Sequence, residues 1–170
     1  NWGLSYRNRT GVLIPTGTAL TLQSFLDAVK ARRVFATEDK AGQLVLTANG
    51  HVMGEAFSNA GTLTLVANYA STSGQTASRI QFFEGVPGRN GTVTQLTEGT
   101  DTYAFTPAAG DHFYYAIVTQ ANGDKLFSAP VWVTQGSGGA TAPAITGQPA
   151  NATVTAPATA TFSVTASGTA

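Results

Sequence analysis

The most constraining feature of the sequence is a hydrophobic period of two that recurs in short stretches from Val34 to Val133. Alternation of this kind places successive side chains on opposite faces of a strand. Turn-forming residues separate the stretches at near-even spacing, which predicts a β-sandwich of the Ig-like or fibronectin-like kind. The predicted strands cover residues 34–37, 43–48, 51–53, 62–69, 79–84, 92–96, 102–106, 112–120, 126–128 and 131–133.

Two stretches fix the arrangement of this predicted sandwich. Asn49-Gly50 is the strongest short signal for a hairpin turn. Residues 112–120 form the longest predicted strand and carry apolar or aromatic residues on both faces, so we expect a central position in a sheet. The stretch Gly110–Tyr115 is typical of the corner and strand found late in such sandwiches.

One helix is predicted ahead of the sandwich, over residues 21–33. Leu22, Phe25, Leu26 and Val29 fall at i, i+3, i+4 and i+7, which makes one apolar stripe. Thr21 is the expected N-cap. Burial of the stripe would stabilise the fold by about 1.5–3 kcal/mol per side chain. The helix therefore needs a partner surface, and the irregular residues 1–19, with one possible strand at 12–14, offer little.

Charge and cysteine content exclude several classes of function. Nine acidic and nine basic residues cancel, so no net field attracts nucleic acid or an anionic membrane. The chain has no cysteine, which excludes disulfides, zinc–thiolate sites and thiol nucleophiles. No apolar run reaches the roughly 18 residues of a membrane span. No charged residue follows Lys125, and such a neutral Thr/Ala/Gly/Ser/Pro stretch is typical of the linkers and β-modules of exported bacterial proteins, so we expect a secreted or cell-surface protein.

The composition changes near residue 135. Residues 135–143 predict a Gly/Ser linker. Residues 144–170 are similar to the opening strands of a bacterial Ig-like repeat, with Phe162 and Val164 on one face, and the chain ends before that repeat is complete. Two or three strands cannot bury their own apolar face. We expect a partial second Ig-like domain that is completed by something else, and an excerpt of a longer protein.

Residues 1–135 also resemble a known enzyme family. The motifs that carry the resemblance are Asn1-Trp2-Gly3, Asn8-Arg9-Thr10-Gly11, the helix with the following Arg-Val-Phe-Ala-Thr strand, and Asn49-Gly-His-Val-Met-Gly. They resemble the C-terminal end of secreted metallohydrolases of the polymerase and histidinol phosphatase (PHP) superfamily. The resemblance implies that residues 1–37 end a barrel-type catalytic domain and that residues 38–134 form the sandwich.

The same resemblance implies that the chemistry lies upstream of this chain. The family hydrolyses phosphoesters with a water activated by divalent metals, here manganese, zinc or iron. Its ligands would precede Asn1, so no catalytic residue, metal ligand or cofactor is assigned to this chain. Asn1, Trp2, Arg7 and Arg9 are the expected neighbours of the parent site. The upstream barrel is the expected partner.

Other candidate residues have simpler structural explanations. His51 and His112 are too far apart in sequence, without cysteine, to suggest a metal site, and adjacent strand residues such as Asp111 and His112 point to opposite faces. Strand aromatics usually pack, but a sugar-binding platform is an alternative. The residues considered for it are Trp2, Tyr69, Tyr103, Phe113, Tyr114, Tyr115 and Trp132.

Three functional hypotheses follow. The first is a non-catalytic accessory region of a secreted metal-dependent phosphoesterase. The second is an extracellular carbohydrate-binding or adhesion module that contacts polysaccharide. The third is a structural subunit of a surface layer or fibre, assembled when another copy completes the partial Ig-like domain by strand addition.

Overall fold

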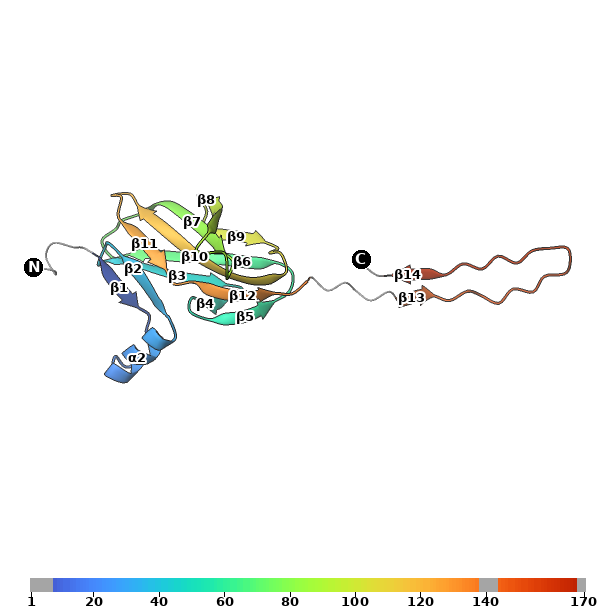
Figure 1. Ribbon diagram of the computed structural model, residues 1–170, viewed down its shortest axis with the longest axis horizontal. Coiled ribbons are helices and arrows are strands. Elements are labelled where there is room, and N and C mark those ends of the chain that lie inside the picture. The colour runs from blue at the N-terminus through green and yellow to red at the C-terminus, as the bar shows by residue number, and fades with distance from the viewer. Residues whose placement is uncertain (1–7, 138–143, 168–170) are drawn as a thin grey trace, which may run out of the picture. The chain divides into compact units, whose positions relative to one another are not determined.

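The computed structural model describes residues 8–137 and 144–167. The chain divides into two compact units, residues 1–136 and 137–170, which are treated separately below. The first unit is built from two sheets and one helix (Figure 1).

The larger sheet of the first unit has eight strands. Along its main path the order is β1-β2-β11-β10-β12-β5, and β7 and β8 continue from the other side of β10. Its strands are β1 (Arg9–Val12), β2 (Val34–Thr37), β5 (Ala56–Asn59), β7 (Ala77–Gly85), β8 (Val93–Glu98), β10 (Gly110–Gln120), β11 (Lys125–Ser128) and β12 (Val131–Gln135). All pairs are antiparallel except β5 with β12.

The smaller sheet has four strands in the order β4-β3-β6-β9. They are β3 (Gly42–Ala48), β4 (His51–Val52), β6 (Leu63–Ser71) and β9 (Thr102–Phe105). The core lies between the two sheets, where alternate residues of each strand point inward. Its fully buried large side chains are Leu44, Leu46, Met53, Leu63, Leu65, Phe82, Tyr114, Val118, Leu126, Val131 and Val133.

The predicted fold class is confirmed: the chain is mainly β, with a β-sandwich and one amphipathic helix. Ten strands lie where the alternation predicts them, and β10 has the predicted central place. Strand β5 is missing from the prediction because Phe57 is its one large apolar residue. The strand considered at residues 12–14 is misplaced: β1 spans Arg9–Val12, so the two ranges share only Val12.

The helix and its neighbours are part of the same unit as the sandwich. Helix α2 (Leu22–Lys30) lies between β1 and β2 in the sequence, so it follows the first strand of the sandwich. Strand β2 pairs with β11 through Phe35 and Ser128. The boundary expected between residues 37 and 38 therefore falls inside a compact unit that begins upstream of the helix.

The second unit contains one short antiparallel pair, β13 (Ala144–Gly147) with β14 (Thr165–Ser167). Ile145, Phe162 and Val164 are 58%, 59% and 56% exposed. The predicted inward face of a partial Ig-like domain thus has no cover within the described residues of this unit. The predicted linker lies largely in residues 138–143, outside the described residues.

A candidate docking site on helix α2

Helix α2 begins at a well-defined cap. The Thr21 hydroxyl accepts a hydrogen bond from the Ser24 backbone N–H at 3.1 Å, and the Ser24 hydroxyl accepts one from the Thr21 N–H at 2.9 Å. This reciprocal arrangement satisfies two donors that a helix start leaves unpaired. The predicted N-cap is confirmed, whereas the predicted C-terminus at residue 33 is wrong. The helix ends at Lys30 because Arg32 has a φ of 56°, outside the right-handed helical region.

The apolar stripe of α2 is exposed instead of buried. Leu22 is 75% exposed, and Phe25, Leu26 and Val29 are each about 40% exposed, at 41%, 39% and 42%. Leu20, just before the cap, is 78% exposed. Because helix positions advance by about 100° per residue, Ala28 lies beside the stripe, about 110° from its centre. The helix therefore packs on the protein through Ala28, which is only 4% exposed, while Leu22 lies largely in solvent and Phe25, Leu26 and Val29 stay partly uncovered.

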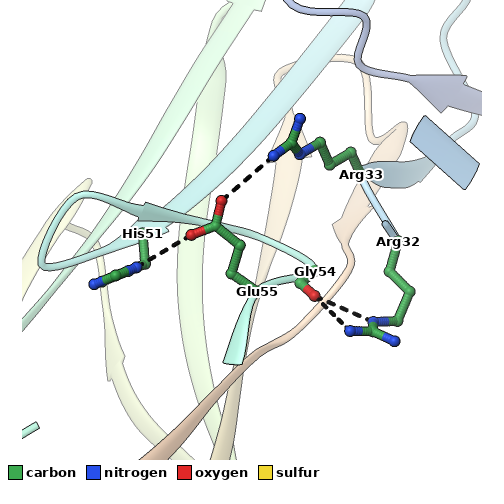
Figure 2. A network of polar contacts seen from close by, with 5 residues as sticks. All are labelled: Arg32, Arg33, His51, Gly54 and Glu55. Carbon is green, nitrogen blue, oxygen red and sulfur yellow. Dashed lines mark hydrogen bonds and ion pairs between the residues drawn. The ribbon is translucent and has the colours of Figure 1, made fainter. Parts of the chain in front are cut away.

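A contact network fixes the C-terminal end of α2 to the sandwich (Figure 2). Arg32 donates from Nε and Nη2 to the Gly54 carbonyl at 3.1 and 2.9 Å, and its guanidinium lies 4.8 Å from the ring centroid of Trp132. Both contacts favour one orientation of the guanidinium, because a cation is attracted to the face of an indole ring. The positive φ of Arg32 directs its side chain into this position.

Arg33 extends the same network on the other side of the turn after β4. Its Nη2 lies 3.5 Å from Glu55 Oε1, and Glu55 Oε2 lies 3.1 Å from Nδ1 of His51 (Figure 2). The His51 ring stacks on Phe57 at 3.9 Å between centroids. Arg33 and Glu55 side chains are about a third exposed, so this ion pair adds little stability. Its effect is to orient the junction.

Gly54 is required at this junction for two reasons. Its φ is +95°, which side chains other than glycine rarely adopt. A Cβ at this position would lie 2.1 Å from the Ala31 carbonyl oxygen and 2.8 Å from the carbonyl carbon of Arg32. The end of the helix thus rests directly on the backbone of residue 54, and the helix has a defined place on the sandwich.

An apolar hollow of about 410 Å³ lies next to the network, where the segment between β1 and α2 meets β3 and β4. It is lined by Leu13, Ile14, Pro15, Thr16, Arg33, Val45 and Val52. Together with the stripe it gives this end of the molecule an uncovered apolar surface. An exposed surface of this kind, with polar residues at its border, is typical of an interaction site.

The residues expected to border a parent site are placed only in part. Asn1, Trp2 and Arg7 lie outside the described residues. Arg9 is exposed at the start of β1, and it lines a polar hollow of about 280 Å³ with Glu38, Asp39, Lys40 and Asp124. The structure does not bring Arg9 to the end of the molecule where α2 lies, because Arg9 pairs with Thr37 and Val12 pairs with Val34.

The aromatic residues, which were expected to pack and had a sugar-binding platform as the alternative, lie on two different faces of the sandwich. Tyr114 is fully buried, and Tyr69 and Tyr103 pack against the core. Phe113, Tyr115 and Trp132 lie on the outer face of the larger sheet, each partly exposed, and Phe113 is directly opposite Trp132. Packing in the core is thus the role of the first three residues only. Trp2 lies outside the described residues.

His112, Glu84 and Tyr114 form a polar cluster in which Glu84 contacts both of the other side chains. The His112 Nε2 donates to the Ala108 carbonyl at 2.9 Å, and its Nδ1 lies 3.0 Å from Glu84 Oε1. The Tyr114 hydroxyl donates to the same Glu84 oxygen at 3.1 Å. Burial, and after it the charge of Glu84, raise the pKa of Tyr114 well above its ordinary value of 10. Burial also raises the pKa of Tyr115.

The described part of the chain contains neither a metal-binding cluster nor a helix that could span a membrane. Among residues 8–137 and 144–167, no three His, Asp or Glu side chains gather closely enough to hold a metal ion. Within the same residues, no helix has the length and apolar character needed to cross a membrane.

Comparison with known proteins identifies no family. No protein-family model matches the chain, and no curated protein matches it. Among solved structures, the chain is similar to an engineered protein, with a TM-score of 0.38 and 16% identity over 54% of this chain and 20% of that one. It is also similar to the fibronectin(III)-like modules of Clostridium thermocellum CbhA, with a TM-score of 0.37 and 21% identity over 72% of this chain and 62% of that one. At this level of identity and TM-score, the two likenesses name no family for the chain.

Proposed function

We propose that residues 8–137 form a non-catalytic accessory β-sandwich of a larger secreted protein, and that this module docks on a neighbouring folded domain through α2. The observation that carries the proposal is the exposed apolar stripe on a helix that is capped and fixed to the sandwich. A helix that served only its own domain would direct Leu22, Phe25, Leu26 and Val29 inward.

A neighbouring domain is favoured over a second copy of the chain by the size of the surface. The five exposed fractions correspond to roughly 400 Å² of apolar side chain. A symmetric pair would then bury about 800 Å² in total, below the 1,200–2,000 Å² of stable interfaces. Contacts between domains of one chain form at smaller areas, because the linkage raises the effective concentration.

The resemblance to the PHP superfamily suggests the identity of that domain. In this proposal it is the barrel of a metal-dependent phosphoesterase, which holds manganese, zinc or iron, and α2 packs against it. The exposed stripe is the feature of this chain that favours such a buttressing role. The second unit would act as a spacer or anchor, and its exposed Ile145, Phe162 and Val164 would be covered by added strands, which another copy supplies in our third hypothesis.

Hydrogen exchange of the natural protein that contains these residues tests the docking directly. We expect the amides of α2 to be protected in the longer protein and to exchange faster in the 170-residue chain. The double variant Leu22→Ser/Phe25→Ser should abolish the protection in the longer protein, and Gln23→Ser on the polar face should not. Equal exchange of α2 in both proteins would contradict docking through this stripe.

Two further measurements test the remaining parts of the proposal. The intact mass of the natural protein should be well above 17.5 kDa, whereas a mass near that value would contradict an accessory role. The 170-residue chain should not hydrolyse a chromogenic phosphodiester with added manganese or zinc. Turnover that a chelator abolishes would contradict the non-catalytic assignment.

A further inference from the structure

A second candidate binding site lies on the outer face of the larger sheet, at the edge formed by β12 and β5. It is a hollow of about 590 Å³, within the 300–1,000 Å³ that is typical of small-ligand sites. The residues that line it include Arg32, Ser58, Pro87, Asp111, Trp132 and Thr134. We refer to these six residues as the Trp132 hollow.

Further aromatic side chains lie on the same outer face of the larger sheet, on β10 and β7. Phe113 of β10 is directly opposite Trp132 of β12, and opposite Gly85 on its other side. A Cβ at residue 85 would lie only 1.9 Å from Cζ of Phe113, so the ring lies directly over the backbone of β7. Phe83 and Tyr115 stack beside it with centroids 5.1 Å apart. The outer face thus carries Trp132 in the hollow and, toward β7, a second partly exposed aromatic group made of Phe113, Phe83 and Tyr115.

Hydrogen-bonding groups stand beside these rings in fixed positions. The Thr134 hydroxyl donates to Asp111 Oδ1 at 2.7 Å, which orients the carboxylate while Oδ2 takes no part in this bond. The bonds of Arg32 to Gly54 use Nε and Nη2 and do not involve Nη1. One carboxylate and one guanidinium balance in charge, so the hollow favours a ligand with no net charge.

We propose that the Trp132 hollow binds a neutral sugar unit of an extracellular polysaccharide. A pyranose ring presents an apolar C–H face and a border of hydroxyls, which matches the part of the Trp132 ring that Arg32 leaves exposed, with the Asp111 carboxylate and the Arg32 guanidinium next to it. Asp111 accepts hydrogen bonds from the sugar, Arg32 donates to it, and Phe113 with the Phe83–Tyr115 pair contacts the next units of the chain. The carboxylate disfavours phosphate, so nucleic acid does not fit. This site shares Arg32 and Trp132 with the contacts that hold α2 on the sandwich, but sugar binding does not require that α2 docks on another domain.

The two tryptophans of the chain make a direct assay possible. A Trp2→Phe variant of the 170-residue chain leaves Trp132 as the single tryptophan. Its emission is followed during titration with cellohexaose, chitohexaose and xylohexaose, and retention on insoluble cellulose, chitin and xylan is measured in parallel. We expect a saturable shift of the emission with at least one of these sugars, with retention on the matching solid.

Variants show whether the binding occurs in the hollow. Trp132→Ala should weaken retention about tenfold, as expected for the loss of one stacked aromatic contact. Asp111→Asn preserves the shape and should weaken binding by a smaller factor. Phe127→Ala is the matched control, since this ring is 39% exposed on another strand and outside the hollow. It should leave binding unchanged.

Two outcomes would overturn the proposal. The first is no saturable emission shift and no retention with any of the three sugars. The second is full retention by both Trp132→Ala and Asp111→Asn when circular dichroism shows them folded. Because the assay reads Trp132 in the isolated chain, either outcome would leave the docking of α2 unaffected, and a failure of α2 docking would leave this site standing.

Discussion

The sandwich core and helix α2 contain the same kinds of side chain in opposite environments. Leu44, Leu46 and Leu65 are fully buried between the sheets, whereas Leu22 of the helix is 75% exposed. Both sets show the regular apolar period of their element. Hydrophobic periodicity thus identifies which face of a helix or strand needs a partner. It does not show whether that partner lies in the same compact unit.

The largest expected effect separates these two environments directly. Leu65→Ala should lower the free energy of unfolding by about 2–5 kcal/mol, because it leaves a cavity in the core. Leu22→Ala should change it by less than about 0.5 kcal/mol, because little is buried there. Urea unfolding of the 170-residue chain measures both. A cost of several kcal/mol for Leu22→Ala would mean that the stripe is packed in solution.

The next largest effect concerns Gly54, where the end of α2 contacts the sandwich. Gly54→Ala should cost about 2–4 kcal/mol, because strain at positive φ adds to the overlap with the Ala31 carbonyl. Gly123→Ala is the matched control, with a φ of +91° and nothing within 4 Å of the added Cβ. It should cost only about 1–2 kcal/mol. Equal costs, measured by thermal unfolding, would show that the helix end does not rest on residue 54.

The pH dependence of the free energy of unfolding tests the sandwich core alone, through the buried Tyr114. The folded state raises the pKa of Tyr114, so the unfolded state loses its proton first when the pH rises above 10. Stability should therefore be unaffected by this group below pH 10 and should fall above it by about 1.4 kcal/mol per pH unit.

The measurement for this prediction is urea unfolding between pH 8 and pH 11.5. Tyr114→Phe should lower the slope above pH 10, although it also removes the hydrogen bond to Glu84. Tyr103→Phe is the control, because it removes a tyrosine outside this cluster and should keep the slope. An unchanged slope in Tyr114→Phe would contradict the assignment.

The smallest expected effect measures how much the contacts of Arg32 contribute to holding α2 on the sandwich. Arg32→Gln removes the bonds to Gly54 and the contact with Trp132, and it should cost about 1 kcal/mol. The amides of α2 should exchange faster while those of β10 do not. Lys30→Gln, at the polar side of the same helix end, should leave the exchange of α2 unchanged. Unchanged exchange in Arg32→Gln would mean that the contact with Ala28 alone holds the helix.

Most of the fold could be predicted from local pattern, and the candidate sites could not. Strands such as residues 43–48 alternate strictly, and Thr21 is a recognisable cap, so both follow from the sequence. The exposure of Leu22 depends on whether another surface covers the stripe of α2, and the hydrophobic periodicity of the helix does not contain that information. The approach of Arg32 to Trp132, 100 positions later, follows from the order of strands in the sheet.

The outer aromatic face illustrates the same limit. Phe113, Tyr114 and Tyr115 are consecutive aromatics, and their alternation predicts opposite faces but not which face is the core. The structure directs Tyr114 inward and its neighbours outward because β10 pairs with β7 in the register that places Tyr114 opposite Glu84. Gly85 lies just beyond the predicted strand 79–84, and nothing in the sequence identifies Phe113 as the ring that covers it.

The parallel pairing of β5 with β12 has a consequence for how the chain folds. Asn59 and Gln135, whose side chains bond at 2.8 Å across this pair, are 76 positions apart in the sequence. Contacts of such long range slow folding, because loop closure comes before the contacts that offset it. A chain that emerges N-terminus first from a ribosome or an export channel cannot close its larger sheet until residue 135 has appeared. The smaller sheet, by contrast, is complete in the sequence at Phe105, so the larger sheet is the last part of this unit that can close.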